Sequence, residues 1–167
     1  MKIAIISDIH DHRQKLQKAL AQIQDVDKMI CCGDLCSPFI IRDLGAGFSK
    51  TIHIVFGNND ADLFRITLTA SDFEHIHLHG EAAELLLDGK KFAITHFDNI
   101  GRMFATSDAY DVVCYGHNHK YEVAYEGKTL KINPGEIMGE LTGNSTFVVY
   151  DTETDEVTRY EISADAG

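Results

Sequence analysis

Residues 2–12, Lys-Ile-Ala-Ile-Ile-Ser-Asp-Ile-His-Asp-His, contain the pattern that decides the fold of this chain. Lys2–Ser7 is apolar almost throughout, which is typical of a short strand buried on both faces. Carboxylate and imidazole side chains follow at once, in Asp8 and His10. In open α/β sheets, ligands bind at the carboxyl ends of the strands, so this stretch predicts an α/β fold with a site at a strand end.

The next fifty residues continue this pattern. Arg13–Gln24 carries apolar residues at helical spacing, which predicts an amphipathic helix. Met29–Cys32 and Thr51–Phe56 are further short apolar runs, each followed by glycine. Between them, Pro38 begins a helical segment that we expect Gly45 to end. The first third therefore predicts β-α-β-α-β, with parallel strands joined by right-handed crossovers.

The remainder favours antiparallel pairs. Asp88-Gly89 and Glu126-Gly127 each separate two strand-like runs and predict hairpins. Val112–Tyr115 predicts another buried strand, and Thr146–Asp151 and Val157–Ile162 alternate around a polar turn. Parallel units followed by hairpins suggest an α/β fold, a four-layer α/β/β/α sandwich of two mixed β-sheets flanked by helices.

Length and composition limit the functional classes. The 167 residues show no repeat, linker or composition break, so we expect a single domain over residues 1–167. The net charge of −11, without a basic stripe, argues against a long nucleic acid as partner. No apolar run approaches the ~18 residues of a membrane span, and the run Ile3-Ala4-Ile5-Ile6 is too short for the apolar region of a signal peptide, which predicts a cytoplasmic protein. Nothing in the sequence requires an oligomer.

Five predicted strands end in Asp, Asn or His, several directly after a glycine that permits a sharp turn and a close approach. In an extended backbone, a spacing of two places both members of a pair on one face. Carboxylate, imidazole and amide oxygen are ligands for divalent metals, so these tips predict a metal centre. The motifs are Asp8-x-His10, Gly33-Asp34, Gly57-Asn58-Asn59-Asp60, Thr95-His96 and Gly116-His117-x-His119.

This ordered set resembles the calcineurin-like metallophosphoesterase superfamily. The length, the Asn133-Pro134-Gly135 turn and the lack of a cap domain make the chain similar to the small single-domain phosphodiesterase branch, near the metallophosphoesterase-fold subunit of retromer. The resemblance runs from Lys2 to about Ile162. It implies two metal sites with one bridge: Asp8, His10 and His119 would hold the first metal, Asn58, His96 and His117 the second, and Asp34 both.

The resemblance implies a dinuclear metal-dependent phosphoesterase that acts on small-molecule or nucleotide phosphodiesters. Two divalent ions roughly 3.5–4 Å apart can hold a bridging hydroxide that attacks phosphorus. The cations would reverse the negative charge of the ligand carboxylates, so a small phosphoester is attracted. Ligation by oxygen and nitrogen suits manganese, which we expect, and also iron, cobalt, nickel or zinc.

Two alternatives stay open. The first is a phosphomonoesterase or a nucleotide polyphosphate hydrolase. The second is a non-catalytic interaction module on the same fold, which we would expect to have lost metal ligands. All seven ligand positions are filled here, and this favours catalysis.

Asn59 departs from the family pattern, because many members have there a histidine thought to protonate the leaving oxygen. An amide is a poor proton donor at pH 7, so aryl or pyrophosphate-like leaving groups should be favoured. His12, two residues after His10, is the candidate replacement donor, and a solvent-facing residue at a helix start is the alternative.

Phe97 and Asp98 replace a glycine and a second histidine of the small phosphodiesterases, and we expect them to reshape the substrate side of the pocket. Asp98 would orient a ligand imidazole or, in the interpretation that we prefer, cap a helix over Asn99–Ala105. Glu136 stands where a small hydroxyl residue is usual, and a carboxylate near the metals would discourage highly charged substrates.

The remaining histidines and the cysteines favour ordinary structural roles. His75, His77 and His79 alternate on one face of a predicted strand, without an accompanying carboxylate. His53 is predicted to pack within its strand. The four cysteines lack metal-site spacing and favour small buried side chains.

Overall fold

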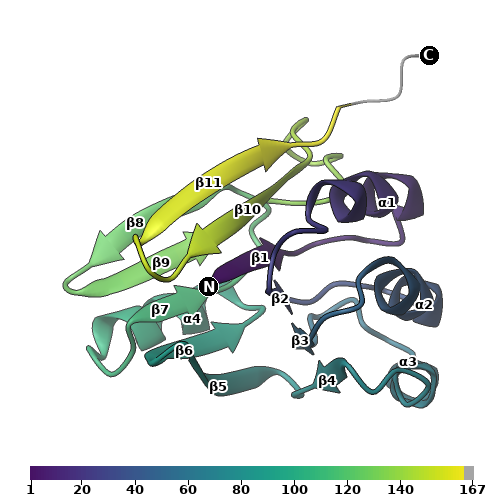
Figure 1. Cartoon of the computed structure of the whole chain (residues 1–167), viewed down its shortest axis with the longest axis horizontal. Helices are drawn as coiled ribbons and strands as arrows, with labels where there is room; N and C mark the ends of the chain where they lie inside the picture. Colours follow the sequence, from purple (N-terminus) through teal and green to yellow (C-terminus); the bar gives the residue numbers. More distant parts are fainter. Residues whose placement is uncertain (164–167) are drawn as a thin grey trace.

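A computed structural model gives the fold of the chain and describes residues 1–163 (Figure 1). The helices and strands follow one another as β1 (Lys2–Ile6), α1 (Arg13–Gln22), β2 (Lys28–Cys31), α2 (Pro38–Gly47), β3 (Ile52–Ile54), α3 (Leu63–Ala70), β4 (Ile76–Leu78), β5 (Ala82–Leu87), β6 (Lys90–Thr95), α4 (Asp98–Thr106), β7 (Val112–Cys114), β8 (Glu122–Glu126), β9 (Thr129–Asn133), β10 (Thr146–Asp151) and β11 (Glu156–Glu161). The prediction of one domain over residues 1–167 stays a prediction, since it extends past the described residues.

The strands form two mixed sheets. The first has the order β11-β10-β1-β2-β3-β4, and the second has the order β5-β6-β7-β9-β8. β1 to β4 are parallel to one another, and β10 and β11 add antiparallel pairs at one side. The helices α1, α2 and α3 lie on one side of the first sheet, as Figure 1 shows. The predicted parallel units and hairpins are confirmed.

Three apolar cores separate the four layers. In β1, Ala4 and Ile6 pack with residues of α1 and α2, whereas Ile3 and Ile5 pack in the core between the two sheets. A small third core around Tyr115 lies between the second sheet and α4. The predicted α/β/β/α sandwich is therefore confirmed, including the burial of the first strand on both faces.

Helix boundaries differ from the predictions at three places. α2 continues past Gly45 to Gly47. A Cβ at Gly45 would lie 2.5 Å from the ring of Phe73, so this position is glycine because the ring packs there and not because the helix ends. α3 was not predicted; it begins after Asp62, whose side chain accepts a hydrogen bond from the backbone N–H of Arg65. α4 begins at Asp98 itself, so Asp98 is not the predicted cap.

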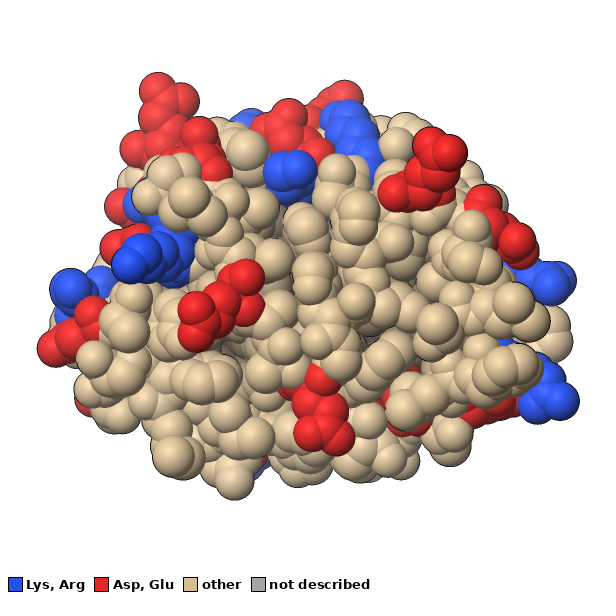
Figure 2. All heavy atoms as spheres, turned by 90° about the horizontal axis from the view of Figure 1, so that it is seen from below, with Lys and Arg blue, Asp and Glu red and all other residues tan. Residues whose placement is uncertain are grey.

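Figure 2 shows the distribution of charged side chains on one face of the molecule, where most of them lie toward the rim. On the face shown in Figure 2, Lys and Arg stand among Asp and Glu, and no continuous basic stripe crosses it. Among the described residues, no helix has both the length and the apolar character needed to cross a membrane.

Candidate metal centre

Five loops converge at the carboxyl ends of β1, β2, β3, β6 and β7. Backbone bonds join them directly: the N–H of Asp8 donates to the carbonyl of Gly33 (3.1 Å), and that of Gly116 to the carbonyl of His96 (3.0 Å). The backbone is left-handed, with positive φ at five of the predicted ligands, Asp8, His10, Asp34, His117 and His119. The side chains therefore converge through strained turns, and the extended backbone expected for the Asp-x-His and His-x-His pairs is wrong.

The first predicted ligand group is assembled. Nε2 of His119 lies 3.4 Å from Oδ1 of Asp8, and Nε2 of His10 lies 3.8 Å from the same oxygen. The rings of His10 and His119 stack with centroids 5.2 Å apart. Asp8 Oδ1 and His10 Nε2 are buried without a hydrogen-bond partner. Buried polar atoms are normally satisfied, so this pair of atoms fits a cation bound between them.

The second predicted group is also assembled. Oδ1 of Asn58 lies 2.9 Å from Nδ1 of His117 and 3.1 Å from Nε2 of His96, and these two ring nitrogens are 3.3 Å apart. Asn58 is exposed, whereas His96 is fully buried. The second group is therefore open to solvent at Asn58 and closed at His96.

Asp34 connects the two groups. Its Oδ2 lies 3.3 Å from Nε2 of His10 and 3.4 Å from Nε2 of His96. The ligand atoms of Asp8, His10 and His119 all lie within 4.8 Å of one another, as do those of Asp8, Asp34 and His96. The arrangement fits two cations that share a carboxylate, in a mixed oxygen and nitrogen environment suited to borderline divalent metals.

Hydrogen bonds select the proton position on two of the imidazoles. Nδ1 of His96 lies 2.7 Å from the carbonyl of Cys32, and Nδ1 of His119 lies 2.8 Å from Oε2 of Glu136. Each oxygen accepts, so each Nδ1 carries the proton and each Nε2 keeps a lone pair for a metal.

Glu136 is fully buried and also accepts from the backbone N–H and the hydroxyl of Thr142, at 2.7 Å each. Its oxygens are therefore occupied by His119 and the loop, and the expectation that its charge discourages highly charged substrates stays a prediction.

The carboxylates give the centre a negative charge. Burial alone would raise the pKa of Asp34, but the adjacent His96 ring and the hydrogen bonds from Asn59 outweigh it and hold this pKa well below its usual range. The neighbouring carboxylate of Asp8, followed by that of Asp34, raises the pKa of His10. Burial lowers the pKa of His96, and Asp34 more than offsets this, so its pKa is raised. A positive charge is therefore favoured here, whether a proton or a metal ion supplies it.

Three glycines permit the loops to meet, as the sequence predicted. A Cβ on Gly57 would lie 2.1 Å from Oδ1 of Asp34, and one on Gly116 would lie 1.9 Å from Oγ of Ser7. Gly33 has a φ of +96°, and a Cβ built on it would lie 2.7 Å from the amide nitrogen of Gly57. These contacts leave no room for a side chain, so the glycines are required by close approach.

Asp60 is a structural residue of the centre that the sequence did not reveal as such. Its carboxylate is buried and accepts backbone N–H bonds from Gly57 (2.7 Å), Cys36 (2.8 Å) and Asp34 (3.0 Å). The signal in the sequence was a glycine followed three residues later by aspartate, a spacing suited to such turns.

Cys36 differs from the three buried cysteines, since it is partly exposed and its Sγ lies 3.6 Å from Nδ1 of His10.

The predicted neighbours of the centre take different positions. Asn59 donates to both oxygens of Asp34, from its backbone and its side chain, at 2.9 Å each. The ring of Phe97 lies 5.4 Å from the rings of both His96 and His117, at the edge of the centre.

Asp98 and His12 lie farther from the ligands. Asp98 accepts from Asn118 (3.4 Å) and faces Arg102 (3.6 Å). His12 stands at the start of α1, with Nε2 3.9 Å from the exposed Glu140.

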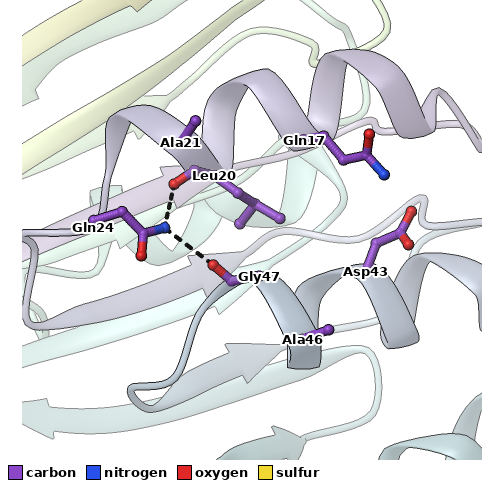
Figure 3. Close-up of a pocket in the computed structure, with 7 residues that line it drawn as sticks. All are labelled: Gln17, Leu20, Ala21, Gln24, Asp43, Ala46 and Gly47. Atoms are coloured by element: carbon purple, nitrogen blue, oxygen red, sulfur yellow. Dashed lines mark hydrogen bonds between the residues drawn. The ribbon is translucent and has the colours of Figure 1, made fainter.

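A groove between α1 and α2 lies away from these loops (Figure 3). Its main polar group, the Gln24 amide, donates to the carbonyls of Leu20 (2.6 Å) and Gly47 (3.1 Å). Asp43 at its rim binds Arg13 at 2.6 Å. The groove is therefore a consequence of helix packing and holds no reactive group.

Comparisons with known proteins agree with this geometry. Residues 1–155 match the family model described as calcineurin-like phosphoesterase superfamily domain. The chain is 36% identical over 160 residues to phosphodiesterase MJ0936 of Methanocaldococcus jannaschii, covering 93% of this chain and 96% of that protein. The solved structure of a novel archaeal phosphodiesterase is 34% identical, with a TM-score of 0.90 over 96% of this chain and 99% of the other. Zinc-complexed Vps29 from Entamoeba histolytica, at 18% identity, shares the fold (TM-score 0.68, covering 100% and 95%).

Proposed function

Because the chain belongs to the calcineurin-like phosphoesterase superfamily, as its motifs predicted, we propose that it is a metal-dependent phosphodiesterase with a dinuclear centre. The observation that carries this proposal is the Oδ2 atom of Asp34, which lies between Nε2 of His10 and Nε2 of His96. One carboxylate oxygen in contact with two ligand groups is the arrangement that a pair of cations needs. Small-molecule or nucleotide phosphodiesters are the proposed substrates, and a cytoplasmic location stays a prediction.

The proposed ligands are the seven predicted residues, with Asp8, His10 and His119 for one cation, Asn58, His96 and His117 for the other, and Asp34 for both. Two bound divalent cations, manganese as first choice, would supply a water-derived nucleophile at neutral pH and neutralise charge on a phosphate. The protein's part is to hold the ligand atoms in place before substrate arrives, which lowers the cost of reorganisation during the reaction.

The surroundings of the centre favour particular substrates. Asn58 and Asn59 are exposed, whereas Asp8, Asp34 and His96 are buried, so a phosphoester approaches from the asparagine side. We propose that Phe97 forms an apolar wall of this approach and that Asp98 shapes it through Asn118.

Asn59 uses its amide to orient Asp34, and it has no acidic proton for a leaving group. We therefore propose that the enzyme prefers leaving groups that need little protonation, with His12 as the donor for those that need more.

The non-catalytic alternative is disfavoured, because all seven ligand residues are present and lie together. A protein that uses this fold only for binding partners has no physical need to keep two buried, unsatisfied ligand atoms, since each lowers stability.

Metal analysis and a substrate panel test the proposal. We expect about two equivalents of divalent metal in the purified protein. We also expect hydrolysis of bis(p-nitrophenyl) phosphate that disappears on exhaustive chelation and returns with Mn²⁺. p-Nitrophenyl phosphate and nucleotide polyphosphates are the matched alternatives. Full activity after chelation would refute metal dependence, and faster hydrolysis of the monoester or the polyphosphate would replace the proposed substrate class.

A further inference from the structure

A second group of histidines lies outside the metal centre, at the edge of the six-stranded sheet. His53 of β3 and His77 of β4 are direct partners in the parallel ladder, and His79 follows two residues later, with its backbone N–H bonded to the carbonyl of Ile54. We call His53, His77 and His79 the edge cluster. β4 is the last strand of its sheet, and the chain passes from it to β5 of the other sheet (Figure 1).

The three rings are in contact with one another. Nδ1 of His53 lies 3.0 Å from Nε2 of His79, and the ring centroids of these two residues are 5.2 Å apart. The rings of His53 and His77 stack at 5.5 Å, with an angle of 27° between their planes. Within the described part of the chain, no carboxylate bonds these rings. The contact between His53 and His79 is a hydrogen bond in which one ring donates its N–H and the other accepts with its lone pair.

We propose that the edge cluster is a binding site for one borderline divalent cation, such as Zn²⁺, separate from the dinuclear centre. Imidazole is a preferred ligand of Zn²⁺, Ni²⁺ and Cu²⁺, and it binds in the neutral form. His53 and His79 are the two fixed ligands. His77 is exposed, so a change of its side-chain torsions brings in a third nitrogen, and solvent completes the coordination.

The geometry needs little change to accept zinc. Two imidazole nitrogens in a tetrahedral site with Zn–N bonds of ~2.05 Å are about 3.3 Å apart. The His53 and His79 nitrogens are already 3.0 Å apart, so they need to separate by a few tenths of an ångström. β3 holds His53 in the sheet, and the backbone bond to Ile54 holds His79, so neither ligand needs a change of backbone.

Burial prepares the rings for a metal. The half-buried environment and the neighbouring imidazoles lower the pKa of His53 to about 4 and also lower that of His79. Both rings are therefore neutral at pH 7, and a metal ion replaces the hydrogen bond between Nδ1 of His53 and Nε2 of His79 once the donor ring carries its proton on its other nitrogen.

Zinc titration of the full chain, followed by NMR of the histidine ring nitrogens, tests this site. We expect Zn²⁺ added beyond the two equivalents of the metal centre to shift the ring nitrogens of His53, His77 and His79. His75 is the internal control, because its ring contacts Phe73 and has no contact with the edge cluster. Unchanged ring nitrogens at three equivalents of zinc would refute the proposal.

Variants add a second measurement. His79→Gln should weaken binding of the third zinc at least ~10-fold while the first two equivalents are kept. His75→Gln should leave all three unchanged. His77→Gln, at an exposed position, serves if His79→Gln does not fold. An undiminished third equivalent in both His79→Gln and His77→Gln would show that these residues do not bind it. The readout is metal stoichiometry, so it is independent of the phosphodiesterase activity.

Discussion

His10 and His96 in the metal centre and His53 and His79 in the edge cluster are the same side chain in opposite electrostatic settings. In the centre, Asp8 and Asp34 raise the pKa of the imidazoles, and the backbone is left-handed at most of the ligands. At the edge, the imidazoles meet mainly one another, and burial lowers their pKa in a regular strand ladder.

The difference teaches which feature distinguishes a built metal centre from a group of histidines. In the centre, ligand residues have left-handed backbone and the carboxylates of Asp8 and Asp34 lie close together. Both features cost free energy, which a bound cation offsets. The edge cluster has neither left-handed backbone nor a neighbouring carboxylate among the described residues, so we expect its proposed cation to bind more weakly than those of the centre. Four predictions test this contrast.

The largest effect is expected at the carboxylate that joins the two ligand groups. Asp34→Asn removes the shared negative charge, and we expect it to lower phosphodiesterase kcat by about 1000-fold, which corresponds to ~4 kcal/mol. Metal content should fall with it. Asp72→Asn, at an exposed position, is the control and should keep wild-type values. Retention of full activity by Asp34→Asn would remove the bridge from the proposal.

The partner of a ligand imidazole should have the next largest effect. Glu136→Gln weakens the acceptor that keeps the proton of His119 on Nδ1, so we expect metal affinity to fall about 10–100-fold. Glu140→Gln, on the same loop but exposed, is the matched change and should leave metal affinity intact. Thermal unfolding of both metal-free variants separates lost ligation from a damaged loop. Equal affinities in the two variants would contradict the role of Glu136.

The pH dependence of stability should differ between the two regions. The folded pKa of His53 is about 4, below its ~6.5 in the unfolded chain, so the unfolded state binds more protons between these values. The free energy of unfolding should therefore fall as pH decreases from about 6.5 to 4. After allowance for the partial exposure of the ring, we expect about 1–2 kcal/mol of this loss to be absent in His53→Gln.

Chemical denaturation of metal-free protein at pH 7 and pH 4.5 measures this difference. His10→Gln is the comparison with opposite sign: the raised pKa of His10 contributes stability below pH ~6.5 that is lost as pH rises through the folded value. Parallel pH profiles for wild type and His53→Gln would show that burial does not hold this ring neutral.

The smallest effect is expected at the proposed proton donor. His12 lies at the start of α1 and faces Glu140, so it acts only on substrates whose leaving group needs a proton. We expect His12→Gln to slow an alkyl phosphodiester by less than the ~100-fold of a well-placed general acid and to leave an aryl diester unchanged. Steady-state rates on the two substrates decide this, and an unchanged alkyl rate would exclude His12 as the donor.

Much of the fold was predictable because local patterns and tertiary packing agree in it. The apolar run before Asp8 and the Asp88-Gly89 turn have the conformations that their residue types favour. The predicted end of α2 at Gly45 was wrong because this glycine makes room for Phe73, which lies in a later loop. Contacts between residues distant in sequence leave no periodic signal, so α2 looked shorter than it is.

The ligand residues were predictable from their order along the chain, whereas the groups that support them were not. Nothing next to Glu136 in the sequence points to His119, since only the fold brings them to 2.8 Å. For Asp60, the spacing to Gly57 points to one of its backbone hydrogen bonds, but those from Asp34 and Cys36 come from another loop and leave no local signal. Asp and His are residue types that tolerate positive φ, but the sequence does not indicate which of them adopt it, so left-handed Asp8 and His10 were not predicted.

The carboxylate of Asp60 has a consequence for how the protein acquires its metals. It connects the loops after β2 and β3 through hydrogen bonds from three backbone N–H groups, so this connection needs no metal ion. Small zinc domains, in contrast, unfold when their metal is removed. We therefore expect these two loops to keep their arrangement when metal is removed, so that folding can precede metal binding. On this expectation, metal supply, more than folding, would set which cations the site contains.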